Sequence, residues 1–178
     1  MSDGGIVWIT GLPGAGKSTL ARRVVDRIRR ASIGCVLLDG DDVRSALQLP
    51  AGRGATERDG FYAALAALAA LLADQGLTAV VAATANREVY RERARSLTRR
   101  YVEVHVATPA AECERRDSKG LYAAARAGRA TGVPGVDAPY EVPSHPDVIA
   151  SGGEDVEAVE RVVELLTSRA AEGLDARR

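Results

Sequence analysis

GLPGAGKST, residues 11–19, follows the apolar run IVWI of residues 6–9 and precedes an amphipathic stretch. This order of strand, glycine-rich turn and helix is the one that a phosphate-binding loop requires. Gly11, Gly14 and Gly16 allow the backbone angles that turn successive N–H groups toward a phosphate at a helix N-terminus. The stretch therefore predicts a binding site for a nucleoside triphosphate.

Two side chains at the end of this loop suit the chemistry of a triphosphate. We expect Lys17 to reach the β- and γ-phosphates as a point charge. Ser18 places a hydroxyl where a Mg²⁺ ion that bridges these phosphates takes an oxygen ligand. The nucleotide-binding residues predicted from the loop are Gly11, Pro13, Gly14, Ala15, Gly16, Lys17, Ser18 and Thr19.

The composition suits a single domain over residues 1–178 and argues against a nucleic-acid or membrane partner. The 24 basic and 24 acidic residues cancel, whereas polyanions and membrane surfaces attract a clustered positive excess. No run approaches the roughly 18 apolar residues of a membrane span, and the N-terminus lacks a signal-peptide pattern. We therefore expect a cytoplasmic protein. Cys35 and Cys113 are too few for a disulfide framework and are expected to be plain thiols.

The apolar pattern along the chain alternates between strands and helices. Strands are predicted at residues 6–10, 35–38, 77–83, 102–107 and 148–150. Helices are predicted at residues 17–30, 57–75, 88–99, 110–116 and 156–171, with a frayed tail at about 172–178. Continuous apolar runs separated by helices are typical of an α/β protein whose parallel sheet is covered on both faces.

An acidic segment after the second predicted strand decides between classes of nucleotide-binding protein. Motor-type ATPases carry an acid at the end of a later strand, but residues 78–85 contain no carboxylate, and no guanine-reading NKxD segment is present. The acids lie instead in LLDGDD, residues 37–42, where Asp39 or Asp41 could orient Mg²⁺ waters or accept a proton. An ordinary Asp/Gly turn is an equally good interpretation of this segment taken alone.

Further motifs complete a family pattern. GLPGAGKST and LDGDDVR are followed by CERRDSKGLYAAARAG at residues 113–128 and VDAPYEVP at residues 136–143. Over about residues 6–150 the chain resembles adenylyl-sulfate kinases (APS kinases), which carry LDGDN[IV]R, CExRDxKGLYxKAR and PYExP. The resemblance implies a P-loop NTPase-type three-layer α/β/α fold, with a five-stranded parallel sheet and a lid at about residues 115–135. It also implies a homodimer and transfer of the γ-phosphoryl group of ATP, with Mg²⁺, to the 3′-hydroxyl of adenylyl sulfate.

The resemblance assigns roles to individual residues. Asp41 attracts the proton of the acceptor hydroxyl, and Asp39 lies near the magnesium shell. Lys119, on the lid, offsets charge on the transferring phosphoryl group. Arg44 and Arg58 match arginines that hold the anionic part of the acceptor. These matches give Asp41, Lys17 and Lys119 as catalytic residues, Ser18 and Asp39 as metal ligands, and Arg116 as a further ATP-binding residue.

The acceptor side departs from the family pattern. The family segment GFSxxDRxENIRR is replaced by GRGATERDGFYAA at residues 52–64, which keeps Arg58 and has Ala63 and Ala64 at the later arginine pair. Two phenylalanines sandwich the adenine of adenylyl sulfate in the family. Arg53 and Val133 stand at or near their positions here, so stacking of about 1 to 3 kcal/mol per base is lost.

Phe61 could supply a substitute ring for the acceptor. The predicted acceptor-binding residues are Asp39, Arg44, Arg58, Phe61 and Val133. We therefore expect a kinase with APS-kinase-like parts that acts on a hydroxyl of another small acceptor, either nucleoside-like or a specialised metabolite. An ordinary adenylyl-sulfate kinase with a rebuilt adenine pocket is the second interpretation. A non-catalytic ATP-binding module is the third, and the retained lysines and aspartates argue against it.

Overall fold

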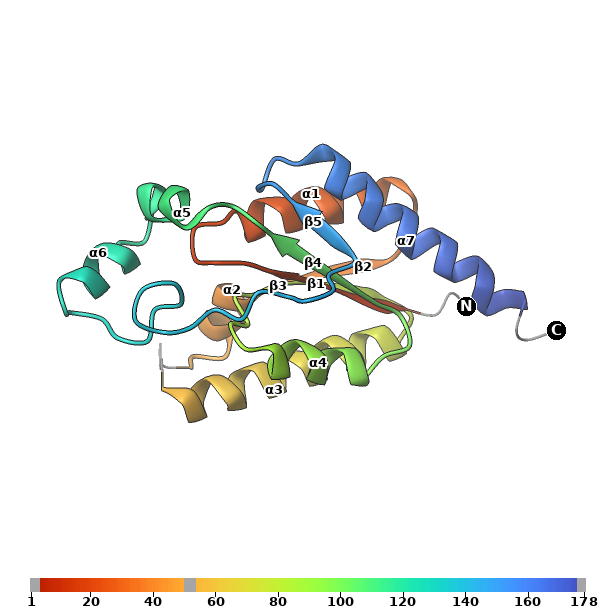
Figure 1. Cartoon of the computed structure of the whole chain (residues 1–178). Helices are drawn as coiled ribbons and strands as arrows, with labels where there is room; N and C mark the ends of the chain where they lie inside the picture. The colour runs from red at the N-terminus through yellow and green to blue at the C-terminus, as the bar shows by residue number, and fades with distance from the viewer. Residues whose placement is uncertain (1–3, 50–53, 176–178) are drawn as a thin grey trace.

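The computed structural model describes residues 4–49 and 54–175, with side chains described as far as residue 168. These residues contain a five-stranded parallel sheet with the strand order β2-β3-β1-β4-β5 (Figure 1). The strands are β1 (Gly5–Thr10), β2 (Cys35–Asp39), β3 (Thr78–Ala82), β4 (Tyr101–Val106) and β5 (Val148–Ala150). The predicted parallel sheet and its place in the α/β class are confirmed.

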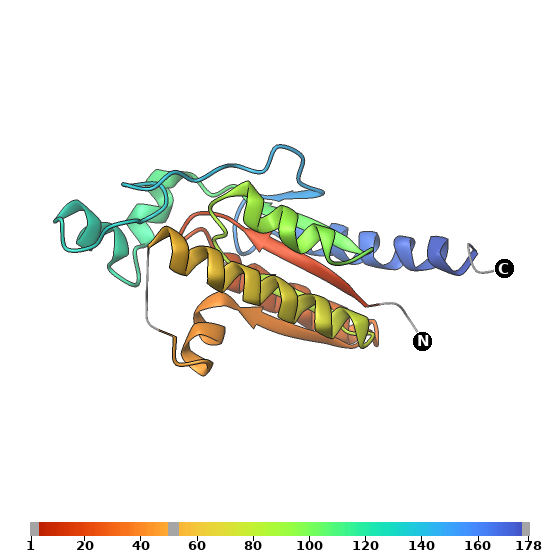
Figure 2. The ribbon, with the colours of Figure 1, turned by 90° about the horizontal axis from the view of Figure 1, so that it is seen from below.

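Helices cover both faces of this sheet (Figures 1 and 2). The helices are α1 (Lys17–Arg30), α2 (Gly40–Ala46), α3 (Ala55–Asp74), α4 (Glu88–Ser96), α5 (Ala110–Arg116), α6 (Leu121–Arg126) and α7 (Val156–Asp175). Helices α1 and α7 pack on one face, and α3 and α4 on the other. None of the helices in residues 4–49 and 54–175 combines the length and the apolar composition needed to cross a membrane.

Strand β1 is buried on both faces, which explains its unbroken apolar sequence. Successive side chains of a strand point to opposite faces of the sheet. Val7 and Ile9 accordingly join the core beneath α1 and α7, whereas Ile6 and Trp8 join the core beneath α3 and α4. The central strand thus contributes side chains to both hydrophobic cores, one on each face of the sheet.

Helix α3 lies close to the sheet because its inward face is built from small side chains. Ala66, Ala69 and Ala73 are all buried there, together with Leu65. Gly76 follows the helix with a φ of 85°, the left-handed conformation that commonly ends a helix. The alanine-rich run is therefore a packed helix, as its leucine spacing predicts.

The structure differs from the sequence-based boundaries in a few places. Two short helices, α2 and α6, were not expected, and α3 begins at Ala55 rather than at residue 57. Helix α4 ends at Ser96, three residues before the predicted end at 99. Helix α7 continues to Asp175, four residues beyond the predicted end at residue 171.

The carboxyl ends of the parallel strands gather at one end of the sheet, opposite the end at which β1 begins (Figure 1). Loops leave β1, β2 and β3 at this end, and α5 and α6 project beyond it (Figures 1 and 2). Ligands of open α/β sheets bind outside the carboxyl ends of the strands. The topology therefore brings the predicted phosphate loop, the acidic segment and the predicted lid to the same end.

Candidate active site

The glycine-rich loop between β1 and α1 forms a cradle at a helix N-terminus. Gly14 has a φ of 78° and Gly16, the N-cap of α1, a φ of 101°, both in the left-handed region. A Cβ atom on Gly16 would lie only 2.7 Å from the backbone nitrogen of Gly153. Glycine is therefore required at Gly16 by backbone angle and by space, and the first N–H groups of α1 stay open to an anion.

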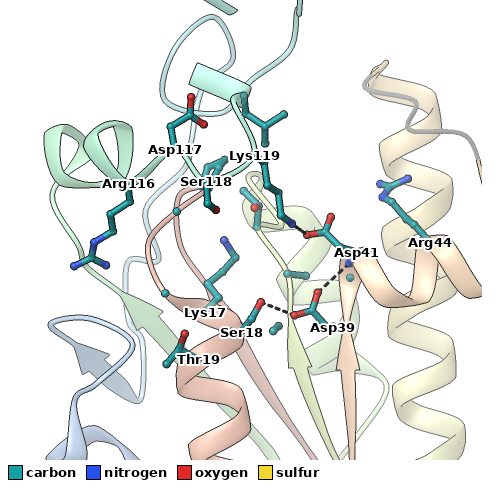
Figure 3. Close-up of a pocket in the computed structure, with 18 of the residues that line it drawn as sticks. Lys17, Ser18, Thr19, Asp39, Asp41, Arg44, Arg116, Asp117, Ser118 and Lys119 are labelled. Carbon is teal, nitrogen blue, oxygen red and sulfur yellow. Dashed lines mark hydrogen bonds and ion pairs between the residues drawn. The ribbon is translucent and has the colours of Figure 1, made fainter. Parts of the chain in front are cut away.

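Lys17 points across this loop (Figure 3). Its Nζ atom donates hydrogen bonds to the backbone oxygens of Gly11 at 3.0 Å and Leu12 at 2.8 Å. Burial lowers the pKa of the Lys17 ammonium group to about 8, although Asp41 and Asp39 favour the charged form. A bound phosphate group would stabilise the charged ammonium form of Lys17, which burial disfavours.

Ser18 and Asp39 bring together a hydroxyl and a carboxylate from two different elements (Figure 3). Ser18 Oγ donates to Asp39 Oδ2 at 2.5 Å. The other carboxylate oxygen, Oδ1, accepts the backbone N–H of Asp41 at 3.1 Å, so Asp39 also caps α2. The acidic segment is thus a capped helix start whose first carboxylate faces the phosphate loop.

This pair of oxygen donors fits a magnesium ion bound together with nucleotide phosphates. Mg²⁺ is usually held by one or two carboxylates, with phosphates and waters completing its shell. Within the described residues no group of three or more His, Cys, Asp or Glu side chains could hold a metal without such help. Ser18 and Asp39 would therefore hold magnesium only in the company of a triphosphate.

Asp41 and Lys119 meet across the cleft from distant parts of the sequence. Lys119 Nζ donates to Asp41 Oδ2, which joins the start of α2 to the segment between α5 and α6 (Figure 3). Both side chains are exposed, at 69% for Asp41 and 60% for Lys119. An exposed carboxylate and an exposed cation thus lie next to the space above the phosphate cradle.

One cavity of about 400 Å³ contains most of the predicted site. The predicted residues that line it are Pro13, Gly14, Gly16, Lys17, Ser18, Thr19, Asp39, Asp41, Arg44, Phe61, Arg116 and Lys119. Gly11 and Ala15 belong to the same loop but are buried, and they do not line this cavity. The remaining two, Arg58 and Val133, line an adjoining cavity of about 250 Å³, which also contacts Arg44 and Asp41.

The second cavity lies between α3 and the turn at residues 132–137. Arg58 of α3 donates to the backbone oxygen of Gly132. Asp137 accepts the backbone N–H groups of Gly132 and Val133, both at 2.6 Å, and these bonds lower the pKa of its carboxyl group. The turn is therefore fixed from both sides, and Val133 is buried at 2% exposure.

Phe61 does not offer the free ring that the sequence suggested. It is 6% exposed, and the guanidinium carbon of Arg44 lies 3.6 Å from its ring centroid. The ring instead supports Arg44 through a cation–π contact. The other residue considered near the acceptor, Arg53, lies outside the described residues.

Arg116 occupies the far side of the larger cavity (Figure 3). Its Nε atom donates to Glu112 Oε1 at 2.9 Å within α5. Arg116 is exposed, and its ion pair with Glu112 orients the guanidinium group. The position is compatible with contact to the nucleoside part of a bound triphosphate.

Several residues of the site were missed by sequence reasoning. Tyr62 lines both cavities, and its hydroxyl oxygen accepts the backbone N–H of Ala85 at 3.0 Å. Tyr122 donates to the backbone oxygen of Pro13 at 2.9 Å and so ties α6 to the phosphate loop. Tyr122 belongs to the quoted KGLY motif, which could have drawn attention to it, whereas nothing distinguished Tyr62 within an alanine-rich helix.

A buried arginine fixes the other side of Ala85. Arg91 is 1% exposed and donates to Ala85 O at 2.8 Å and to Glu103 Oε1 at 2.8 Å. Ala85 itself has a φ of 38°, which is uncommon for a residue with a side chain. Two side chains from different helices thus hold a strained residue between Thr84 and Asn86, which both line the smaller cavity.

Comparisons with known proteins point to one family. The model of one family, described as Adenylylsulphate kinase, matches residues 3–151. An adenylyl-sulfate kinase of Picosynechococcus sp. is 39% identical over 163 residues, covering 90% of this chain and 92% of that protein. One from Vibrio vulnificus is 39% identical over 168 residues, covering 92% of this chain and 81% of that protein. The solved structure of the Mycobacterium tuberculosis APS kinase CysC in complex with AMPPNP and APS superposes with a TM-score of 0.86 at 36% identity, over 94% of this chain and 99% of that one.

Proposed function

Because the chain belongs to the adenylylsulphate kinase family, we propose that it transfers the γ-phosphoryl group of ATP to a hydroxyl group of a small acceptor. One observation carries this proposal. The phosphate cradle with Lys17 and the Ser18–Asp39 pair faces Asp41 and Lys119 across a single cavity. Phosphoryl transfer depends on positioning and on charge stabilisation, and these residues supply both.

Each of these groups has a distinct task in the transfer. Lys17 binds the β- and γ-phosphates, and Ser18 and Asp39 would hold magnesium, which neutralises phosphate charge when bound. The acceptor oxygen forms a bond to the γ-phosphorus as the bond between that phosphorus and the β–γ bridging oxygen breaks. Asp41 orients the acceptor hydroxyl and takes its proton, and ADP leaves.

Lys119 changes partner during this reaction. In the structure Lys119 pairs with Asp41, so a cation lies against the carboxylate. A γ-phosphate next to Lys17 attracts the Lys119 ammonium group more strongly than a single carboxylate does, because it carries more negative charge. Asp41 is then released to accept a proton, and Lys119 offsets charge on the transferring group.

We propose an acceptor other than adenylyl sulfate, and adenylyl sulfate itself is the second candidate. The first choice is supported by the absence of the family arginine pair, which is replaced by Ala63 and Ala64, and by the buried state of Phe61 and Val133. The second is supported by the relatives, which are named adenylyl-sulfate kinases at about 39% identity. The residues assigned to phosphoryl transfer, Lys17, Asp41 and Lys119, suit both acceptors equally.

The test supplies purified protein with magnesium, ATP and one acceptor at a time, and follows ADP formation. Adenylyl sulfate is compared with nucleosides, sugar alcohols and amino sugars, and the phosphorylated product is identified by mass spectrometry. A Lys17→Ala variant controls for contaminating activity. Turnover with micromolar adenylyl sulfate rejects the first acceptor choice in favour of the second. ADP formation that no acceptor stimulates contradicts the kinase proposal.

A further inference from the structure

The turn between α5 and α6 carries a hydroxyl group that has no role in the reaction described above. Ser118 lines the larger cavity together with Lys17 and Lys119. Its side chain extends from the predicted lid toward Lys17, across the space above the phosphate cradle (Figure 3). In the motif CExRDxKGLY the position of Ser118 is open to any residue, so this hydroxyl is a feature of the present chain.

Hydrogen bonds hold the backbone of this turn on both sides of Ser118. The N–H of Gly120 donates to the backbone oxygen of Asp117 at 2.9 Å. This bond closes a tight turn that has Ser118 and Lys119 at its two central positions. The Asp117 carboxylate accepts the backbone N–H of Ala123 at 2.9 Å, and backbone bonds of this kind lower the pKa of its carboxyl group. The turn and the first residues of α6 thus form one hydrogen-bonded unit.

Tyr122 fixes this unit to the phosphate cradle. Its side chain is 2% exposed, and its hydroxyl donates to the backbone oxygen of Pro13 at 2.9 Å. Pro13 belongs to the glycine-rich loop, so the turn and the loop are held in a defined relation. A side chain of the turn therefore needs little ordering to meet a phosphate group bound by the loop.

The Ser118 hydroxyl is available to a ligand. Within the described part of the chain it forms no hydrogen bond with another residue. Two other hydroxyls of the same cavity are engaged, because Ser18 donates to Asp39 and Tyr122 donates to Pro13. A seryl hydroxyl has one hydrogen to donate, and phosphate oxygens accept strong charge-assisted bonds. Ser118 thus presents a neutral donor to the space where the cradle would hold phosphates.

We propose that Ser118 is a phosphate-binding residue, whose hydroxyl donates a hydrogen bond to the γ-phosphate of bound ATP from the side opposite Lys17. The proposal rests on the proposed function, because it requires a γ-phosphate between the cradle and the lid. Neighbouring residues of one turn then contact the terminal phosphate, Ser118 as a neutral donor and Lys119 as a cation. ADP lacks this contact, so Ser118 distinguishes the substrate nucleotide from the product nucleotide.

The experiment measures nucleotide binding to the intact protein with magnesium by isothermal titration calorimetry. AMPPNP is compared with ADP, because only AMPPNP carries a γ-phosphate. Ser118→Ala should weaken AMPPNP binding about 10-fold, the loss expected for a hydrogen bond to a charged group, while the affinity for ADP stays the same. Unchanged affinity for AMPPNP in Ser118→Ala overturns the proposal, and so does an equal loss of affinity for both nucleotides.

Two further variants separate the hydroxyl from the shape of the side chain. Ser118→Thr keeps the hydroxyl at a residue whose φ is not positive, so it should retain most of the wild-type preference for AMPPNP. Ser45→Ala makes the same chemical change at an exposed residue of α2 outside both cavities, and should alter neither affinity. A Ser118→Thr protein that binds AMPPNP as weakly as Ser118→Ala contradicts the proposal.

The outcome for this contact is independent of the outcome for the reaction, because binding needs no turnover. Selective loss of AMPPNP affinity in Ser118→Ala, together with a wild type that phosphorylates no acceptor, would reject the proposed function and support the contact. A wild type that is active with an acceptor, and a Ser118→Ala variant with unchanged AMPPNP affinity, would reject the contact alone. Retained ADP binding shows that each variant is folded.

Discussion

At the scale of single residues, the proposed reaction depends on the carboxylate of Asp41. Asp41→Asn keeps the size of the side chain and its backbone bond to Asp39 but removes the proton acceptor. We expect kcat to fall about 10²- to 10⁴-fold, the usual contribution of a general base, while ATP binding survives. Steady-state kinetics and a nucleotide titration measure the two effects separately.

Asp42 provides the matched control for this variant. It is the next residue of the same helix and is also exposed, but it does not line the cavity. Asp42→Asn removes one negative charge from the same region and should change kcat little. Near-normal turnover in Asp41→Asn, or an equal loss in Asp42→Asn, removes Asp41 from the mechanism.

The lowered pKa of Lys17 predicts a pH dependence of nucleotide binding. Below about pH 8 the ammonium group is already charged; above it the free protein must take up a proton to bind phosphate. We expect ATP affinity to fall as pH rises through this value. Isothermal titration calorimetry at pH 9, in two buffers of different ionisation enthalpy, should detect proton uptake that is absent at pH 7.

The same pKa shift has a defined sign for stability. An unfolded lysine titrates near 10.4, so between about pH 8 and that value the unfolded chain binds more protons than the folded one. The contribution of Lys17 to the free energy of unfolding therefore rises with pH across this window. In the calorimetric experiment above, equal proton uptake on ATP binding at pH 7 and at pH 9 would contradict the assigned pKa of Lys17.

At the scale of elements, the start of α1 depends on glycine. Gly16→Ala introduces a side chain at a φ of 101° and against the backbone of Gly153. We expect the free energy of unfolding to fall by about 1–3 kcal/mol, the cost of a strained backbone residue, with strongly weakened ATP binding. Chemical denaturation and nucleotide titration provide the measurements.

Gly60 offers a comparison within the same chain. It lies inside α3 with no atom near the place of an added Cβ. Gly60→Ala should increase the free energy of unfolding by about 0.5–1 kcal/mol, because alanine favours a helix interior. If Gly16→Ala were tolerated as well as Gly60→Ala, the cradle would not have the backbone geometry described.

Elements with local signals were predictable from sequence. The two ends of α1 agree with the prediction, because a glycine precedes it and its apolar residues keep a helical period. The end of α3 follows from Gly76. Helix α2 depends on capping by the Asp39 side chain, and the DGDD segment suits a turn equally well. Helix α6 has only six residues, and its sequence falls within the segment predicted as the lid.

The site was predictable where it is continuous in sequence and less so where it depends on packing. Lys17 and Ser18 follow from one loop, and Asp41 and Lys119 from motifs of the resemblance. The pairing of Asp41 with Lys119 across the cleft required the fold. The burial of Phe61 beneath Arg44 and the role of Tyr62 at Ala85 are products of tertiary packing that no local pattern contains.

At the scale of the whole molecule, binding of magnesium and ATP should stabilise the folded state by mass action. A ligand at 100 times its dissociation constant adds about 2.7 kcal/mol, which corresponds to a rise in melting temperature of about 5–10 °C for a chain of this size. EDTA should remove part of the rise, because Ser18 and Asp39 then lack their ion. Lys17→Ala is the control, and an ATP-induced shift as large in that variant as in the wild type would contradict the assigned cradle.

The ion pair between Asp41 and Lys119 has a consequence for the sequence of substrate arrival. An acceptor that enters first meets a carboxylate already neutralised by a cation, whereas one that enters after ATP meets a carboxylate that the γ-phosphate has freed. We therefore expect the nucleotide to bind preferentially ahead of the alcohol in initial-rate and dead-end inhibition studies. Random addition with no preference for either order would contradict it. By this ordering the protein activates an incoming alcohol only when a phosphoryl donor is already in place.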